Sequence, residues 1–193
     1  MTLLLDSTEN MNTPKIWFTS DTHFGHKNII KLCNRPYEDA AQMDEDMIAK
    51  WNSVIKPNDI VWHLGDLSMH RSTWQPDAKI VERLHGRKNI IVGNHDNEGF
   101  LRKCNFERVI EGIHNVTFDH NDAQVFFVLA HYPLREWVGF YRGAYHLYGH
   151  VHNGLPNFGR SMDVGVDTNG FMPYSLEDVL SILAPQENKH PGK

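Results

Sequence analysis

The stretch FTSDTHFGHKNII, residues 18–30, places one aspartate and two histidines within six positions at the end of an apolar run. The run itself, KIWFT at 15–19, is rich in β-branched and aromatic residues and predicts a buried strand. Asp21, His23 and His26 follow directly on this predicted strand. Polar side chains at a strand exit are typical of the ligand sites of open α/β sheets.

Further apolar runs predict the rest of the fold. Strands are expected at 59–64, 88–92, 107–111, 124–130 and 145–149, and helices at 42–55, 72–84 and 175–183. Ser175 is the expected N-cap of the last helix, and Pro76 is expected in the first turn of the second. Strands alternate with helices in the first half of the chain and follow one another in the second. This order favours an α/β core with added antiparallel strands over a purely parallel sheet.

The composition bounds the class of protein. The 193 residues, 40% of them apolar, fit a single domain over 1–193, with 1–13 and 185–193 expected as loose tails. No apolar run reaches the ~18 residues of a membrane span, and LLL at 3–5 lacks the flanks of a signal peptide. Cys33 and Cys104 lie far apart, outside any paired-ligand spacing. We therefore expect a cytoplasmic protein with free thiols and no membrane partner.

The charge and the histidine content narrow the function. A formal net charge of -5 disfavours a protein that coats duplex nucleic acid, since such proteins normally carry a strongly basic face. The 13 histidines are more than packing alone requires, and imidazole is the commonest metal ligand in proteins. The histidine content therefore favours a metal-binding protein.

Donor side chains recur at five of the predicted strand exits, which read SDTHFGH, HLGDLS, VGNHDN, LAHYP and YGHVHN. Together they supply Asp21, His23, Asp66, Asn94, His95, Asp96, His131, His150 and His152. A lone histidine such as His63, His85 or His114 is more often a packed or surface residue, and a Gly-Asp pair is commonly a turn. Only the repetition at successive exits favours a shared site.

The donor types favour a hard or borderline metal. Carboxylate, imidazole and amide oxygen without thiolate suit Mn, Fe, Zn, Ni, Co or Mg. In Asp21-x-His23 and His150-x-His152, alternate residues of an extended segment point the same way, so each pair can address one site or two neighbouring sites. Two metal ions about 3.5–4 Å apart need about seven protein ligands and a bridge, which is roughly what the exits offer.

The ordered series Asp21-x-His23, Gly65-Asp66, Gly93-Asn94-His95-Asp96, His131 and Gly149-His150-x-His152 resembles that of the calcineurin-like metallophosphoesterases. The resemblance covers residues 21–152 and implies a four-layer αββα sandwich of two mixed sheets flanked by helices. It also implies that Asp21, His23 and His152 bind one metal ion, that Asp66 bridges, and that Asn94, His131 and His150 complete a second site. His95 would be the general acid or phosphate-orienting residue, and Asp96 its partner.

One block departs from the family pattern. Many members have a further Asp or Arg shortly after the Gly-Asp pair, whereas this chain reads GDLSMHR at 65–71. The metal ligands are unaffected, but no phosphate contact is assigned to Ser68, His70 or Arg71.

Substrate-binding side chains are expected in the loops around the metal ions. The segment YPLREWVGFYRGAYH at 132–146 interleaves aromatic residues with arginines, which suits stacking on a base and pairing with a phosphate. Packing of these aromatics onto the domain is an equal alternative. The predicted substrate-binding residues are Arg35, Arg135, Trp137, Tyr141, Arg142 and His26. For His26, an ordinary loop position is an equal alternative.

The function implied is hydrolysis of phosphate esters by a hydroxide activated between two divalent ions, Mn²⁺ foremost. We expect a phosphodiesterase acting on a nucleotide, a cyclic phosphate or an exposed nucleic-acid end, with no obligate protein partner. Alternatives are a phosphomonoesterase for small phosphorylated molecules, a non-catalytic metal-bound scaffold of the same fold, and a metal-storage or oxygen-reactive site. The run Asn94-His95-Asp96 favours an enzyme over a scaffold.

Overall fold

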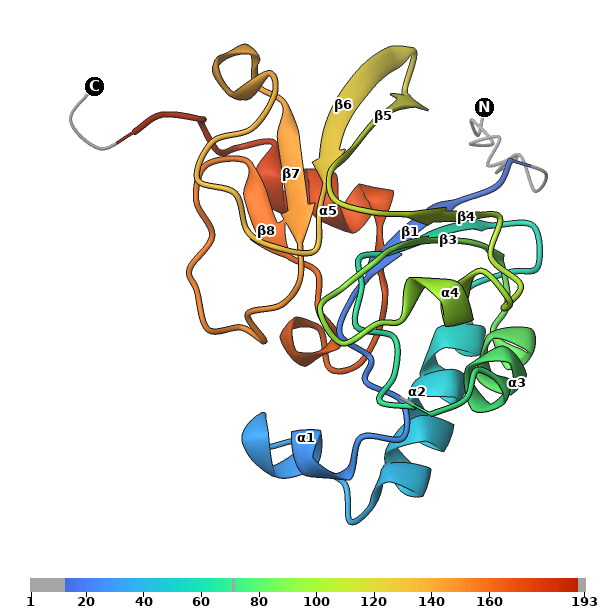
Figure 1. Ribbon diagram of the computed structural model, residues 1–193. Helices are drawn as coiled ribbons and strands as arrows, with labels where there is room; N and C mark the ends of the chain where they lie inside the picture. The colour runs from blue at the N-terminus through green and yellow to red at the C-terminus, as the bar shows by residue number, and fades with distance from the viewer. Residues whose placement is uncertain (1–12, 71, 191–193) are drawn as a thin grey trace, which may run out of the picture.

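Two mixed sheets form the centre of the computed structural model, which describes residues 13–70 and 72–190 (Figure 1). The first sheet has the order β4-β3-β2-β1-β9 and the second the order β5-β6-β7-β8. The first sheet consists of β1 (Ile16–Thr19), β2 (Ile60–His63), β3 (Arg87–Ile91), β4 (Arg108–Ile110) and β9 (Tyr174–Ser175). The second consists of β5 (His114–His120), β6 (Ala123–Leu129), β7 (Tyr145–Tyr148) and β8 (Ser161–Asp163).

Each sheet combines parallel and antiparallel pairs. In the first, β1 to β4 are parallel to their neighbours and β9 is antiparallel to β1. In the second, β5 and β6 form an antiparallel hairpin, whereas β6, β7 and β8 are parallel. The prediction of an α/β fold with two mixed sheets and flanking helices is therefore confirmed.

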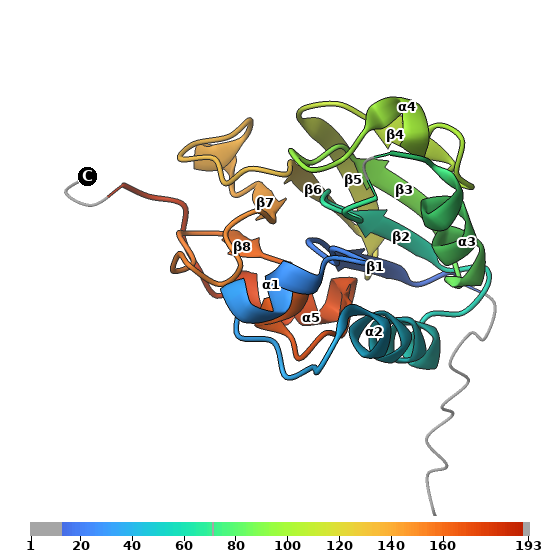
Figure 2. The ribbon, with the colours of Figure 1, turned by 60° about the horizontal axis from the view of Figure 1, so that its bottom comes forward.

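Helices flank the sheets. The helices are α1 (Lys27–Leu32), α2 (Ala40–Val54), α3 (Gln75–Arg83), α4 (Glu98–Leu101) and α5 (Leu176–Leu183). Figure 2 shows α2 and α3 beside the first sheet, and their apolar side chains share a core with its outer face. The outer face of the second sheet is covered by the loop 132–144 with the short 3-10 helix η1 (Phe140–Arg142).

Alternation along the strands separates the cores. In β1, Trp17 joins the core under α2, and its neighbour Phe18 faces the space between the sheets. Phe18 stacks there on Phe127 of β6, with ring centroids 5.7 Å apart. In β6, Val128 points the other way, into the core under the loop 132–144. Successive side chains of a strand point to opposite faces, so a strand covered on both sides reads as a continuous apolar run.

All six predicted strands and all three predicted helices are present, within a few residues of the expected bounds. Pro76 lies in the first turn of α3, and Ser175 caps α5 in a capping box with Asp178. The prediction missed β5, β8, β9, α1 and α4. The last four of these are short, with two to six residues each, and β5 alternates polar and apolar residues with only Phe118 buried.

The C-terminal segment is not a loose tail as far as residue 190. Asn188 accepts a hydrogen bond from the amide of Arg160 at 2.6 Å and donates to the carbonyls of Phe140 and Ala144 at 2.9 and 2.8 Å. The ring of His190 stacks on Phe140 at 5.1 Å. The segment therefore supports the loop 132–144. The expected N-terminal tail lies outside the described residues, apart from Thr13, and in the described part of the chain no helix has the length and apolarity to span a membrane.

His146 of β7 is buried on the outer face of the second sheet. Its Nδ1 lies 2.9 Å from the carbonyl of Val128, and its Nε2 accepts a hydrogen bond from the amide of Leu134 at 3.0 Å. These contacts fit the neutral ring with its proton on Nδ1. Burial lowers the pKa of His146 to about 4. The folded protein therefore holds this ring neutral at a pH where the unfolded chain protonates it.

The replacement His146→Asn should weaken the pH dependence of stability. In the unfolded wild type, His146 binds a proton below about pH 6.5, whereas in the folded protein it binds one only below about pH 4. The free energy of unfolding of the wild type therefore falls as the pH falls through this window. The loss is on the order of 3 kcal/mol at full protonation. Urea unfolding with chelator at pH 4 to 7 should show a flatter slope for the variant. His120→Asn, at the end of β5, is the control. An unchanged slope in His146→Asn would contradict the prediction.

Candidate metal centre

Five loops meet where β1, β2, β3, β6 and β7 end. In Figure 1, β6 and β7 point toward the middle of the molecule, where the loop after β1 also passes. Backbone hydrogen bonds join these loops: Asp21 N–H donates to the carbonyl of Gly65 at 3.0 Å, His23 N–H to that of Asp66 at 3.1 Å, and Gly149 N–H to that of His131 at 2.9 Å. The predicted ligands are thereby brought together from both sheets.

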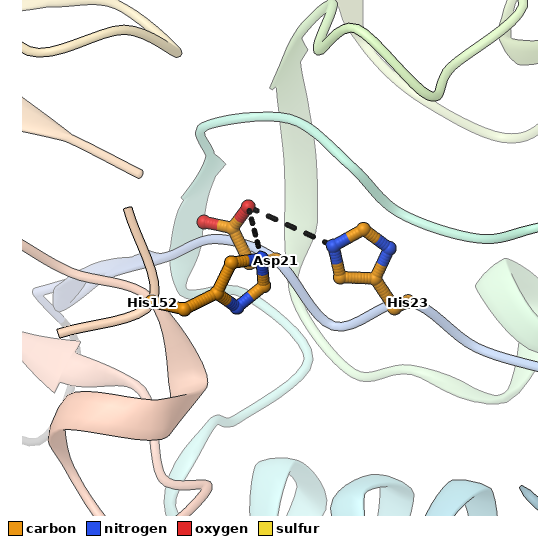
Figure 3. A group of neighbouring side chains, drawn as sticks. All are labelled: Asp21, His23 and His152. Atoms are coloured by element: carbon orange, nitrogen blue, oxygen red, sulfur yellow. Dashed lines mark ion pairs between the residues drawn. The ribbon is translucent and has the colours of Figure 1, made fainter. Parts of the chain in front are cut away.

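The first group of donors is Asp21, His23 and His152 (Figure 3). Asp21 Oδ1 lies 3.9 Å from His23 Nε2 and 3.8 Å from His152 Nε2. Asp21 and His23 are 0% and 1% exposed, yet Asp21 Oδ1 and both ring nitrogens of His23 have no hydrogen-bond partner among the described residues. A buried polar atom without a partner costs free energy, so these atoms fit a bound cation.

The pKa values of Asp21 and His23 also suit a bound cation. Burial raises the pKa of the Asp21 carboxyl to about 7 and lowers the pKa of His23 to about 3. His23 is therefore the neutral imidazole that binds metals. A divalent ion beside Asp21 would favour the ionised carboxylate.

The second group is Asp66, His131 and His150, with Asn94 between the two rings. Asn94 Oδ1 lies 2.9 Å from His131 Nε2 and 2.9 Å from His150 Nδ1. His131 Nδ1 lies 2.8 Å from the carbonyl of Leu64 and donates to it. Burial lowers the pKa of His131, but Asp66, Asp21 and this carbonyl outweigh the burial and raise it, which favours a proton on Nε2 between Asn94 Oδ1 and Asp66 Oδ2. A metal ion could take the place of this proton.

Asp66 lies between the two groups. Its Oδ2 is 3.6 Å from His23 Nε2 and 3.5 Å from His131 Nε2, and its Oδ1 accepts the amide N–H of His95 at 2.8 Å. Burial raises the pKa of this carboxyl, but His131, the His95 amide and His23 outweigh the burial and lower it to about 2. Asp66 is thus an ionised carboxylate that lies within reach of both groups, and its role as the bridge stays a prediction.

The backbone at the ligands is strained. Positive φ angles occur at Asp21 (56°), His23 (50°), Asp66 (56°), His150 (71°) and His152 (47°). This region disfavours residues with a Cβ, by roughly 1–2 kcal/mol each, and such residues gather at functional sites. The hydrogen bonds between the loops hold these conformations in place.

Two glycines make room for the carboxylates. A Cβ on Gly93 would lie 2.2 Å from Asp66 Oδ1, and a Cβ on Gly149 would lie 2.2 Å from Asp21 Oδ2. The next amide, that of His150, donates to Asp21 Oδ2 at 2.9 Å. Glycine at these two places therefore allows the direct approach of the carboxylates to the backbone of a neighbouring loop.

His95 and His26 lie beside the first group. The ring of His95 is 5.3 Å from that of His23, and the ring of His26 is 5.4 Å from His23 and 6.4 Å from His95. Asp96 accepts three backbone amides, those of Asp66 at 2.8 Å, Leu67 at 2.9 Å and Gly93 at 2.9 Å. Asp96 thus positions the loop of Asp66; its predicted pairing with the ring of His95 stays a prediction.

Two of the predicted substrate-binding residues are buried and used in packing. Trp137 is 6% exposed, donates its ring N–H to the carbonyl of Ala144 at 3.0 Å and packs on Phe140. Arg35 is 5% exposed and is occupied by Asp167 and by backbone carbonyls. Neither side chain is available to a substrate, so the packing alternative holds for Trp137 and the prediction for Arg35 was wrong.

The next two lie far from the metal ligands. Arg142 lines a cavity of about 460 Å³ with Gln124 at the start of β6 and Tyr145 at the start of β7. Both strands run from there toward the metal loops, so Arg142 and its neighbour Tyr141, 62% exposed, lie at the opposite end of the sheet. A small substrate bound at the candidate metal centre would not reach these two side chains. Arg135 is exposed four residues after His131, and its role stays a prediction.

Sequence reasoning missed two residues of the centre. Asp167 lies 2.7 Å from His152 Nδ1, through its Oδ2. It stands in the short helix η2 (Val166–Thr168), and no periodic pattern marks that position. Tyr132, 50% exposed, has its ring 4.6 Å from that of His150 and 5.1 Å from that of His131. Its place directly after His131 was the available signal.

Comparisons with known proteins point to one family. The family described as calcineurin-like phosphoesterase matches residues 14–154, a range that contains all seven predicted ligands. The uncharacterized protein MJ1445 of Methanocaldococcus jannaschii is 33% identical over 180 residues, 90% of this chain and 93% of that protein. The gene 66 protein of Mycobacterium phage L5 is 38% identical over 87 residues, 42% of this chain and 39% of its own length.

A solved structure, that of the protein of unknown function AQ665 from Aquifex aeolicus, matches with a TM-score of 0.69 and 23% identity. The match covers 89% of this chain and 100% of that one, and it shows a shared fold. Together with the family match over residues 14–154, these findings give the conclusion. The chain belongs to the calcineurin-like phosphoesterase family.

Proposed function

We propose that the protein hydrolyses phosphate diesters of nucleotide type with the help of two divalent metal ions. The observation that carries this proposal is the position of Asp66, whose Oδ2 lies 3.6 Å from His23 Nε2 in one donor group and 3.5 Å from His131 Nε2 in the other. Two separate metal sites would not require a shared carboxylate. A shared carboxylate suits a pair of ions that act on one phosphate.

The donors divide between two ions. Asp21, His23 and His152 would hold one, Asn94, His131 and His150 the other, and Asp66 both. Mn²⁺ is proposed for both, and the same donors suit Fe, Zn, Ni, Co or Mg. When bound, such ions supply a nucleophile from water near neutral pH and stabilise negative charge on the phosphate oxygens.

His95 is the residue proposed to act on the leaving group. Its amide is anchored on Asp66 Oδ1 at 2.8 Å, which fixes the residue relative to the donors, and its ring lies beside that of His23. As the bond from phosphorus to the leaving oxygen breaks, a ring N–H of His95 can donate its proton to that oxygen. This proton would prevent the departure of a free alkoxide.

Tyr132 is proposed as the substrate-facing aromatic residue in place of Trp137. Its half-exposed ring stands against His150, and an exposed aromatic face there can stack on a nucleobase. Asn94, in the same group, is exposed, which suits a small nucleotide, a cyclic phosphate or a nucleic-acid end. We also propose that the protein acts in the cytoplasm without an obligate protein partner, in keeping with its two free cysteines.

Removal of metal should abolish hydrolysis. The activity on bis(p-nitrophenyl) phosphate should fall at least about 100-fold when the protein is stripped with a chelator, and it should return when Mn²⁺ is added. The reason is that the ions both neutralise the charge on the phosphate and supply the nucleophile. Added Mn²⁺ should not restore the activity of the Asp66→Asn variant. The control variant Asp119→Asn, at an exposed position of β5, should behave as wild type. Full activity in protein shown to be metal-free by mass spectrometry would refute the proposal.

His95→Asn should lower kcat by about 10²–10³ on a dinucleotide, because general acid catalysis contributes about that much when the leaving alkoxide is poor. The loss should be smaller on bis(p-nitrophenyl) phosphate, whose leaving group needs less protonation. Metal content should be unchanged, and His120→Asn is the matched control. Equal losses on the two substrates would argue against proton donation by His95.

Tyr132→Ala should raise KM for a dinucleotide about tenfold, which corresponds to the loss of one stacking contact. A substrate without a base, methyl p-nitrophenyl phosphate, should be affected less than twofold. Tyr141→Ala is the matched control, since that exposed tyrosine lies at the opposite end of the sheet. Steady-state kinetics on the two substrates checks the prediction, and equal effects of the two tyrosine variants would contradict it.

A further inference from the structure

A buried ion pair lies directly behind the metal ligand His152. Asp167 Oδ2 is 2.7 Å from His152 Nδ1, and Arg35 donates to both oxygens of Asp167, through Nε at 2.8 Å and Nη2 at 2.9 Å. Paired hydrogen bonds of this kind fix both the position and the plane of a carboxylate. The carboxylate in turn fixes the ring of His152.

Arg35 also holds the segment that carries the other ligands of the first group. Its Nη2 donates to the carbonyl of Asp21 at 2.8 Å, and its Nη1 donates to that of Thr22 at 3.0 Å. One side chain thus connects the loop after β1, the connection between α1 and α2, and the helix η2. Asp21 and His152, which are 131 positions apart in the chain, are oriented through the same guanidinium.

The pair determines which nitrogen of His152 faces the metal site. Asp167 accepts the proton on Nδ1, so the lone pair of the neutral ring is on Nε2, which points toward Asp21 Oδ1 at 3.8 Å. The thiol of Cys33 lies near enough to His152 and Asp167 to complete a third donor group. The guanidinium on Asp167 opposes a cation there, so the carboxylate serves His152.

Among the described residues, no carboxylate holds the Nδ1 atom of either histidine of the second group. His131 Nδ1 is held by the neutral carbonyl of Leu64 at 2.8 Å, and His150 Nδ1 itself faces Asn94. A carboxylate behind a ligating imidazole raises its basicity and metal affinity more than a neutral carbonyl does. The outer histidine of the first group, His152, is half-buried, whereas that of the second, His150, is more exposed.

We propose that the Arg35–Asp167 pair positions His152 for metal binding and makes the site of Asp21, His23 and His152 the tighter of the two. This inference rests on the proposed two-metal function, in that both groups must bind metal. It assigns a role to Arg35 and Asp167 that differs from substrate contact. The two sites would then fill in order, the first before the second.

The test measures Mn²⁺ binding to stripped protein by the electron paramagnetic resonance of free Mn²⁺. His150→Ala isolates the first site, and His152→Ala isolates the second. Asp167→Asn should weaken binding about 10- to 100-fold in the His150→Ala protein, which is the usual cost of losing such a partner. In the His152→Ala protein the same change should alter binding less than twofold. Glu45→Gln, which breaks the exposed Arg83–Glu45 pair, is the matched control.

Arg35→Lys, which keeps the charge but not the paired contacts, should weaken the isolated first site by a smaller factor. Wild-type affinity in both Asp167→Asn and Arg35→Lys would overturn the proposal. Equal losses at the two isolated sites would overturn it too, because they would show a general structural role. These outcomes are distinct from failure of the proposed function, since wild-type protein that binds two Mn²⁺ without hydrolysing any diester leaves the binding result intact.

Discussion

The centre depends on one constraint, the burial of ionised Asp66 between two sets of imidazoles. A buried carboxylate is costly unless hydrogen bonds and positive charge compensate it. Its Oδ1 receives the His95 amide, and the Asp66 amide itself is held by Asp96, so the orientation of the carboxylate is fixed before any ligand arrives. The loops after β1, β2 and β3 take their positions from this one group.

The grouping of the candidate metal ligands could be predicted from the sequence because the pattern of donors is repeated. Parallel strands end at the same edge of a sheet, so donors that follow successive strands must meet there, and the structure brings together all seven predicted ligands. Apolar runs rich in β-branched and aromatic residues gave six strands, the three-residue β4 among them. They could not give β8 and β9, because the sequences SMD and YS form no such run and become strands only through pairing with β7 and β1.

The substrate-binding residues were less predictable, because the sequence does not show whether an arginine or an aromatic side chain faces the solvent or the core. Arg35 and Trp137 are buried by contacts with Asp167 and Phe140, which lie elsewhere in the chain or across a turn. The role of Asp167 could not be predicted from the sequence for a related reason. Only the folded loop after β7 brings its partner His152 next to it. Pairings of this kind are set by tertiary structure and leave no period in the sequence.

The left-handed backbone at the five candidate ligands has a consequence for metal binding. The free energy that this conformation costs is supplied by folding and by the hydrogen bonds between the loops. A cation would therefore meet donors that are already in place, and little further conformational entropy would be lost when it binds.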